Sequence, residues 1–357
     1  MPDREAGIHL LENLAEGRPG VVLITGKRAA ARFGLEGIAA RSKFWISKVP
    51  PNPTVADLFQ CLSRLEGQSV NRLICIGGGS TIDLGKALRA FLGGGCPDSC
   101  DSLRQAIIRR AYSPGTADLV AVPTTAGTGA DLTPWATVWD MQNHQKLSVD
   151  SPWLAPELSL IIPEFTLRMP ERLSLSTGLD ALAQAMEAFW ANSRDPLSQT
   201  LALEAIRHIA DSLPHVLEDP ENLTYRRRMC LGALLSGLAF SRTRTTACHS
   251  ISYPITMRYG VEHGLAAAVT LEAVARLNRE AVPEIDRIYK IFGGEAGLHQ
   301  WLDMVTGGIQ PLRLSAMGVP WEGLDQLAAE AFTVGRMDNN PVLLGQDDVK
   351  EILSQVF

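Results

Sequence analysis

The chain has 357 residues, 46% hydrophobic and 20% charged, so it can bury a large core and is too long for one small domain. Its formal net charge of -6 argues against a protein built to bind nucleic acid or an acidic membrane surface. Residues 1–17 carry acidic side chains and no long apolar run, and no stretch reaches the roughly 18 apolar residues of a membrane span. We therefore expect a cytoplasmic protein that binds small molecules, with no nucleic acid and no membrane among its partners.

Short apolar runs in the first half of the chain end in turns and predict buried strands. These runs are residues 20–26, 43–49, 72–80 and 119–129. Helical patterns separate them, and this alternation predicts a parallel α/β sheet that binds ligands at its strand ends.

Long apolar helices are predicted beyond about residue 170, so the second half is expected to be all-helical. The periodic segments are residues 176–191, 198–213 and 228–240. Pro163 and Pro170 interrupt regular structure before them. We predict an α/β plus all-α protein, with a dinucleotide-binding domain over residues 1–168 and a helical metal- and substrate-binding domain over residues 169–357.

The six cysteines are scattered along the chain and are expected to be free thiols. They are Cys61, Cys75, Cys96, Cys100, Cys230 and Cys248. The segment "CPDSC" has no second cysteine pair to complete a zinc site, so it predicts a surface loop.

Two glycine-rich turns follow predicted strands. The first contains Gly77, Gly78, Gly79 and Ser80, with Thr81 opening the next helix, and the second contains Thr124, Thr125 and Thr128. Glycine lets the backbone approach a phosphate, and the threonine hydroxyls can bind phosphate or ribose. Because "GGGS" is not the G-x-G-x-x-G fingerprint, either turn alone could instead be structural. Two such turns in one sheet favour a nucleotide.

Four polar side chains suggest a metal site. Asp180 and Gln184 are four residues apart on a predicted helix and so point the same way, and His249 and His263 follow on later segments. Together they could supply mixed oxygen and nitrogen ligands to one divalent ion. The alternative is that Asp180 caps or pairs within the helical domain, Gln184 bonds the backbone and the histidines are core residues.

The motifs together resemble the iron-containing, or group III, alcohol dehydrogenases. The segments that carry the resemblance are "PPNPT" (50–54), "GGGSTIDLGKA", "VPTTAGTGAD", "STGLDALAQAMEAF", "HSISYPITMRYGVEHG" and "GRMDNNP". The resemblance implies a dehydroquinate synthase-like architecture, with a dinucleotide-binding domain, a helical domain and a metal at the cleft between them. It also implies a homodimer.

In that family an Asp and a His four apart on a helix bind the metal with two further histidines, and these positions match Asp180, Gln184, His249 and His263. Gln184 stands where most of the family has His, and its neutral amide is a poorer donor than imidazole. The metal could then have three protein ligands plus water, or be dispensable. Tyr253 is a second departure, because well-known members have another histidine there, near the substrate.

The resemblance also assigns cofactor contacts. Asp83 matches a family position close to the nicotinamide, and Lys146 matches a lysine that contacts the cofactor. Ser47 stands where NAD-specific relatives have an acidic residue for the ribose, and Lys48 follows it. This pair predicts a preference for NADPH, with NADH also accepted. The expected metal is Fe(II) or Zn(II), with Mn(II) also suited to this ligand set.

Arg242 and Arg244 precede the first histidine segment, where a guanidinium could bind phosphonate, phosphate or carboxylate. The alternative is that both are solvated surface residues. The segment also resembles the branch of the family that reduces phosphonoacetaldehyde to 2-hydroxyethylphosphonate in phosphonate natural-product biosynthesis. We therefore expect a hydride transfer from NAD(P)H to a small anionic aldehyde, with the metal polarising the carbonyl.

Three other functions fit the same features. A maleylacetate reductase or another group III dehydrogenase would also explain the arginines, and activity with keto acids would identify it. A lyase of the dehydroquinate-synthase type would show no net consumption of NADPH. A non-catalytic relative with a lost metal site would bind NADPH without turnover.

Overall fold

The computed structural model describes residues 1–16, 19–143 and 145–357, and the chain divides into two units. The α/β unit contains Met1–Thr125 and Ala130–Thr166, and the helical unit contains Ala126–Gly129 and Leu167–Phe357. The assignment of dinucleotide binding to residues 1–168 and of metal and substrate binding to residues 169–357 stays a prediction.

A five-stranded parallel sheet forms the centre of the α/β unit, with the strand order β2-β1-β3-β4-β7. The strands are β1 (Val21–Ile24), β2 (Phe44–Ile46), β3 (Arg72–Gly77), β4 (Asp118–Pro123) and β7 (Leu158–Ser159). The four predicted strands are confirmed, and the short β7 extends the sheet beyond them. The chain continues from β1 to β2 on one side and from β3 to β4 on the other, so the order reverses between β1 and β3.

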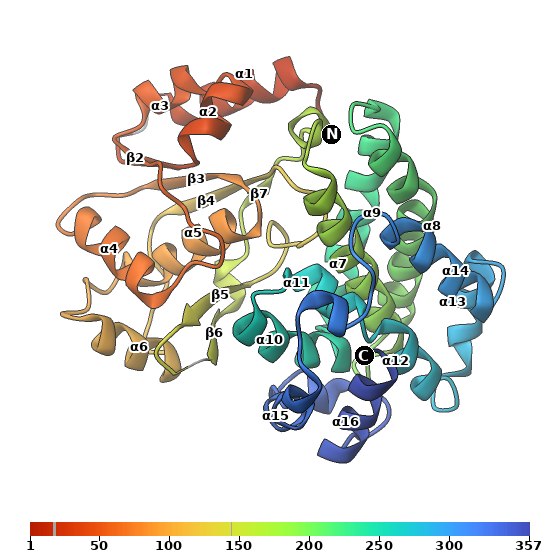
Figure 1. Cartoon of the computed structure of the whole chain (residues 1–357). Helices are drawn as coiled ribbons and strands as arrows, with labels where there is room; N and C mark the ends of the chain where they lie inside the picture. The colour runs from red at the N-terminus through yellow and green to blue at the C-terminus, as the bar shows by residue number, and fades with distance from the viewer. Residues whose placement is uncertain (17–18, 144) are drawn as a thin grey trace. The chain divides into compact units, whose positions relative to one another are not determined.

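Both faces of this sheet are covered by helices, which explains why its strands are continuous apolar runs. Alternate residues enter two separate cores: Val22 and Leu73 belong to one, and Val21 and Ile74 to the other. One face carries α1 (Arg4–Ala15), α2 (Lys27–Phe33) and α3 (Glu36–Arg41), and the other carries α4 (Val55–Leu65), α5 (Gly79–Phe91) and α6 (Cys100–Ile108) (Figure 1).

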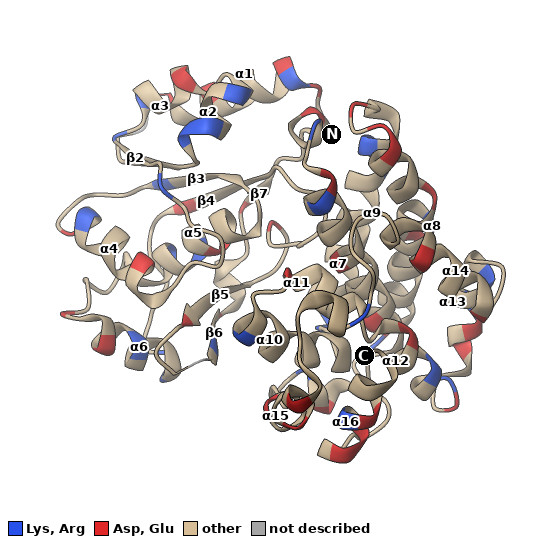
Figure 2. Ribbon diagram, viewed as in Figure 1, with Lys and Arg blue, Asp and Glu red and all other residues tan. Residues whose placement is uncertain are grey.

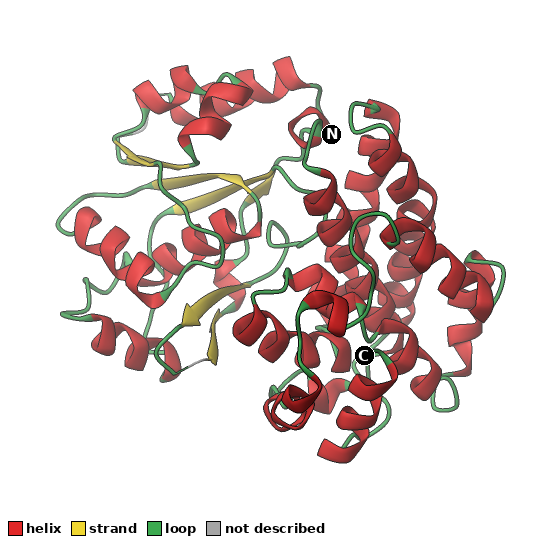
Figure 3. Ribbon diagram, viewed as in Figure 1, coloured by secondary structure: helices red, strands yellow, loops and turns green. Residues whose placement is uncertain are grey.

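A separate antiparallel hairpin was not predicted from the sequence. It consists of β5 (Trp135–Asp140) and β6 (Gln145–Asp150) and packs beside α5 (Figure 3). The ammonium of Lys86 on α5, which is fully buried, donates to Thr133 Oγ1 at 3.0 Å and to the carbonyl of Trp135 at 2.9 Å. This buried lysine therefore fixes the start of the hairpin against the helix.

The described residues of the helical unit contain helices and no strands (Figure 3), so the expected all-helical second half and the α/β plus all-α fold class are confirmed. The α-helices are α7 (Glu171–Trp190), α8 (Pro196–Glu218), α9 (Leu223–Thr243), α10 (Ala247–Tyr259), α11 (His263–Ala268), α12 (Leu271–Asn278), α13 (Asp286–Ile291), α14 (Glu295–Thr306), α15 (Leu324–Glu330) and α16 (Gln346–Gln355). Local sequence explains the starts of two of them, because Asp195 caps α8 and Asn222 caps α9.

Helix α7 is the core of the helical unit. All its residues from Ser174 to Trp190 are buried, and it packs against α8, α9 and α11. A helix enclosed in this way should be apolar all round, and its buried polar side chains need partners within the unit. This requirement identifies the candidate site.

All six cysteines are free thiols, as predicted. In the "CPDSC" segment, the side chains of Cys96 and Cys100 are half-buried. Basic and acidic residues are both distributed over the outer helices of each unit (Figure 2). Among the described residues, no helix combines the length and the apolar character needed to cross a bilayer.

Candidate metal and cofactor sites

Three polar side chains of α7 lie on one face of the helix. Asp180, Gln184 and Glu187 are spaced four and three residues apart, which stacks them over two turns. Asp180 is 3% exposed, Gln184 4% and Glu187 0%. Two acids in an interior this apolar require charged or hydrogen-bonding partners.

Glu187 holds the start of α10 and the ring of His249. Its Oε1 accepts hydrogen bonds from the Thr246 amide at 3.1 Å, the Thr246 hydroxyl at 2.8 Å and the His249 amide at 3.3 Å. Its Oε2 contacts His249 Nδ1. Because the carboxylate accepts a hydrogen bond from Nδ1–H, Nε2, which lies 3.2 Å from Asp180 Oδ1, is the ring atom that a metal would take in place of a proton. The sequence reasoning missed Glu187, although its position three residues after Gln184 placed it on the same face.

His263 reaches the same carboxylate from the first turn of α11. Gly264 makes this approach possible, since a Cβ at this position would lie 1.8 Å from the Ser176 carbonyl on α7. The Ser252 hydroxyl donates to the His249 carbonyl at 2.8 Å and lies 3.3 Å from His263 Nδ1. It can therefore accept a hydrogen bond from Nδ1–H, so that Nε2 of His263, 3.9 Å from Asp180 Oδ1, is the ring atom suited to bind a metal.

The structure thus brings together Asp180, His249 and His263, whose potential ligand atoms all lie within 4.8 Å of one another. Gln184 adds a fourth donor. Its Nε2 donates to the Thr128 carbonyl at 3.4 Å, while its Oε1 is buried without a hydrogen-bond partner among the described residues. A buried acceptor left unpaired is costly, and a cation would satisfy it. The residues present therefore fit a divalent ion with mixed oxygen and nitrogen ligands.

The charges of the cluster are strongly coupled. Burial alone would lower the pKa of His249, but Glu187 and Asp180 raise it to about 10. Burial would raise the pKa of Asp180, yet His249 and His263 hold it below its usual value. The carboxylates therefore favour positive charge at this point of the core.

Tyr253, the second departure from the family pattern, lies beside a predicted ligand. It is 7% exposed, and its ring stacks on His263 with centroids 5.6 Å apart and an interplanar angle of 7°. It fixes one face of the His263 ring.

The first glycine-rich turn follows β3, at the reversal of strand order where α/β sheets bind ligands. Gly78 is the N-cap of α5, and no side chain caps the helix. The free N–H groups of such a terminus suit a pyrophosphate. A Cβ on Gly78 would lie 3.5 Å from Thr125 Oγ1, a buried hydroxyl without a hydrogen-bond partner among the described residues. This turn and Thr125 fit a dinucleotide phosphate.

Other predicted cofactor residues have protein contacts. Ser80 Oγ accepts from the Asn52 amide at 3.1 Å, and the Thr81 side chain fills the space above Gly77, where a Cβ would lie 2.2 Å from Thr81 Oγ1. The Thr124 amide donates to the Gly77 carbonyl at 3.0 Å. Thr128 belongs to the helical unit, where its carbonyl accepts from Gln184.

Asp83 and Lys146 are close enough to interact electrostatically. Burial raises the pKa of Asp83, whose Oδ2 accepts from the Thr137 amide at 3.0 Å, while Lys86 and Lys146 oppose this shift. Burial also lowers the pKa of Lys86 to about 8. Ser47 and Lys48 directly follow β2, the edge strand beside β1.

The two candidate substrate arginines differ. Arg242 forms an exposed ion pair with Asp195, with Nη2 2.6 Å from Oδ2. Arg244 is half-buried in the turn between α9 and α10, two residues before the α10 N-cap Thr246. Of the two arginines, Arg242 thus has an acidic partner at the surface, and Arg244 lies nearer in the chain to His249.

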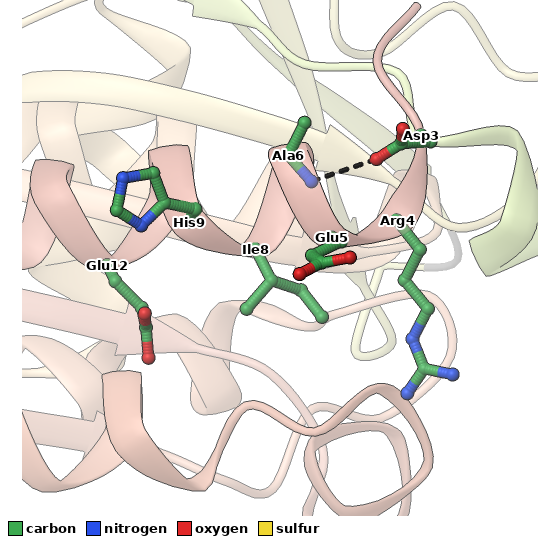
Figure 4. A pocket seen from close by; sticks show the side chains of 7 residues that line it. All are labelled: Asp3, Arg4, Glu5, Ala6, Ile8, His9 and Glu12. Carbon is green, nitrogen blue, oxygen red and sulfur yellow. Dashed lines mark hydrogen bonds between the residues drawn. The ribbon is translucent and has the colours of Figure 1, made fainter.

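A surface depression beside α1 contains none of the predicted site residues (Figure 4). Its lining includes Asp3, His9 and Glu12, and the Asp3 carboxylate caps the helix by accepting from the Ala6 amide at 2.9 Å. The Asp3 carboxylate thus has a structural role at the start of α1.

Family comparisons cover both units. Residues 8–163 match the model described as iron-containing alcohol dehydrogenase. Residues 174–357 match the model of the Fe-containing alcohol dehydrogenase family, C-terminal. The chain belongs to the iron-containing alcohol dehydrogenase family. This confirms the expected family and the class of NAD(P)-dependent oxidoreductases, and it supports a nicotinamide cofactor and a divalent metal.

Similar proteins share most of the chain. A phosphonoacetaldehyde reductase of Streptomyces viridochromogenes is 36% identical over 330 residues, 86% of this chain and 82% of that protein. A choline dehydrogenase of Bacillus subtilis is 29% identical, over 87% of this chain and 80% of that protein. The structure of sulfoacetaldehyde reductase from Bifidobacterium kashiwanohense in complex with NAD+ superposes with a TM-score of 0.87 at 24% identity, covering 98% and 94% of the two chains. The similarity to this last structure shows that the two chains share a fold.

Replacement of Gln184 with histidine should tighten metal binding. Imidazole is a better donor than a neutral amide, so we expect Gln184→His to raise the affinity for Zn(II) about tenfold. Gln184→Leu, which keeps the volume and removes the oxygen, should lower it. Competition with a chromogenic chelator measures both variants, and equal affinity in all three proteins would show that residue 184 does not bind the metal.

Proposed function

We propose that this protein is a metal-dependent aldehyde reductase that transfers hydride from NADPH, or less efficiently NADH, to a small anionic aldehyde. The proposed substrate is phosphonoacetaldehyde and the product 2-hydroxyethylphosphonate, as in phosphonate natural-product biosynthesis. The observation that carries the reductase is the buried cluster on α7, α10 and α11, in which Gln184 Oε1 lacks a partner among the described residues.

Asp180, Gln184, His249 and His263 would hold the metal, here proposed as Fe(II) or Zn(II). When bound, the nicotinamide supplies the hydride and the metal polarises the aldehyde oxygen that receives the charge. Glu187 and Ser252 keep protons on the Nδ1 atoms of the two histidines, so that both Nε2 atoms face Asp180. The uncapped start of α5, with Thr125, would bind the pyrophosphate.

The anionic substrate is supported by Arg244 and by the similarity to phosphonoacetaldehyde reductase. A guanidinium binds a phosphonate through paired hydrogen bonds and so orients the aldehyde at the other end of a short molecule. We expect a smaller contribution to substrate binding from Arg242, because its guanidinium pairs with Asp195.

Loss of Arg244 should affect anionic aldehydes selectively. Arg244→Ala should lower kcat/KM for phosphonoacetaldehyde about 10- to 100-fold, as expected for charge-assisted hydrogen bonds, and should change kcat/KM for acetaldehyde much less. Arg242→Ala, on the last turn of α9, is the matched comparison and should have the smaller effect. An equal loss of kcat/KM for both substrates would show that Arg244 does not bind the anionic group of the substrate.

The choice of cofactor is a separate prediction. Because Ser47 and Lys48 offer a hydroxyl and a cation where an acid would repel a 2′-phosphate, kcat/KM should be higher with NADPH than with NADH. Ser47→Asp should reverse this order. Steady-state kinetics with both cofactors measure it, and strict NADH specificity of the unmodified enzyme would contradict the prediction.

The proposed function is tested by following NADPH absorbance with phosphonoacetaldehyde. Chelator-treated enzyme should be inactive, and Fe(II), Zn(II) or Mn(II), added singly, should restore turnover. Net consumption of NADPH would exclude a lyase that uses its cofactor transiently. NADPH binding without turnover with any metal, on phosphonoacetaldehyde or on keto acids, would contradict a reductase.

A further inference from the structure

The turn that carries Arg244 has a backbone conformation usually reserved for glycine. Arg244 has φ 63° and ψ -179°. A Cβ atom clashes with the backbone in this conformation. Such strain persists only where the surrounding structure enforces it. Glycine would adopt this turn without strain, yet the chain has an arginine.

Side-chain donors hold the carbonyls on this turn. The side-chain Nδ2 of Asn339 donates to the Thr243 carbonyl at 2.8 Å and to the Thr245 carbonyl at 3.1 Å. One side chain therefore bridges the residues on both sides of Arg244. The Ser193 hydroxyl also donates to the Thr243 carbonyl, at 2.6 Å, and the Thr243 hydroxyl donates to the Arg244 carbonyl at 2.8 Å. We call the Asn339 and Ser193 contacts the Asn339 clamp.

The clamp is itself anchored to Asn192 and Ser193, which directly follow α7 and its C-cap Ala191. The backbone N–H of Asn192 donates to the backbone carbonyl of Asn339 at 2.9 Å. The backbone N–H of Ser193 donates to the side-chain Oδ1 of Asn339 at 3.3 Å. The far side of the turn is fixed too, because Glu187 of α7 accepts from the amide and hydroxyl of Thr246. The strained turn is thus held at both ends by groups that are tied to the helix carrying Asp180.

We propose that Asn339 is a positioning residue for substrate recognition, holding Arg244 in a strained turn so that its guanidinium is fixed relative to the metal cluster. This inference rests on the proposed function, in which Arg244 binds the anionic end of the aldehyde. A fixed charge at one end of the substrate determines where the carbonyl lies, and small displacements of such a group reduce the rate. Asn339 is the first Asn of the "GRMDNNP" segment, to which the proposed mechanism assigns no other role.

The strain is tested by two variants that both remove the charge. Arg244→Ala keeps a Cβ in the strained turn, whereas Arg244→Gly relieves the strain, so Arg244→Gly should unfold at a temperature about 1–4 °C higher. Asn339→Ala should lower the unfolding temperature less in the Arg244→Gly background than in the Arg244→Ala background, since glycine needs no clamp. Equal unfolding temperatures of the two Arg244 variants would overturn the strained turn.

Positioning is tested by kinetics on the full-length, metal-loaded enzyme. Asn339→Ala should lower the ratio of kcat/KM for phosphonoacetaldehyde to that for acetaldehyde about tenfold, mainly by raising KM for the anion. Ser193→Ala removes one bond to the same carbonyl and should shift this ratio in the same direction by less, which keeps the test available if Asn339→Ala misfolds. If Arg244→Ala lowers the ratio but folded Asn339 and Ser193 variants do not, the positioning role is wrong. If Arg244→Ala leaves the ratio unchanged, the proposed substrate site is wrong instead.

Discussion

Replacement of His249 with alanine should abolish most of the activity together with metal binding. His249 Nε2 faces Asp180, so the substitution removes one of the two imidazole ligands of the proposed metal site. Lewis-acid polarisation contributes several kcal/mol to reactions of this type, so kcat/KM should fall about 10²- to 10⁴-fold. Elemental analysis after dialysis and steady-state kinetics measure the two effects.

The same change also leaves Glu187 buried without the ring that it orients, so lost activity could reflect a damaged core. His263→Ala separates these effects, because the His263 side chain is 33% exposed and its removal should disturb folding less. His208→Ala, at a half-buried histidine on α8, is the control for removal of an imidazole away from the cluster. Retention of metal and full turnover by a folded His263→Ala variant would contradict the proposed ligand set.

The sequence predicted the helix that carries Asp180 and Gln184 because its signal is local, whereas α10 and α11 were not predicted as helices. A period-3.6 pattern placed Asp180 and Gln184 on one face of a helix, and motif order supplied the two histidines. Glu187 shares that helix and face, but its partners are about 60 residues away in the sequence, and spacing alone does not show which partner a buried acid has. The family resemblance predicted the ligands, and only the structure showed which side chains contact the histidine rings.

The remaining differences also come from tertiary contacts. Residues 119–129 were predicted as one strand with its turn, but β4 ends at Pro123 and residues 126–129 pack in the helical unit. Gly127 permits this, since a Cβ there would lie 2.2 Å from the Thr177 carbonyl. Arg242 and Arg244 looked alike in the sequence because nothing local shows that α9 ends between them.

Replacement of Glu187 with glutamine should impair the metal site without removing a ligand. Glutamine keeps one oxygen for the Thr246 amide and hydroxyl, but its NH2 group would face His249 Nδ1, where the carboxylate now accepts a proton. Two donors cannot pair, so the imidazole should shift its proton to Nε2, the atom that must bind the metal. The carboxylate also stabilises positive charge in the cluster, and glutamine does not.

We expect Glu187→Gln to lower metal affinity about 10- to 100-fold, the usual cost of losing a partner that orients a ligating histidine. Glu204→Gln, at a half-exposed acid on α8 that pairs with Arg207, is the control and should leave affinity unchanged. Chelator competition gives the affinity, and turnover at saturating metal shows whether the loss lies in binding alone. NMR of the imidazole nitrogens in the zinc-loaded protein reports the tautomer directly. An unchanged tautomer with unchanged affinity would limit Glu187 to capping α10, since the Thr246 contacts survive the substitution.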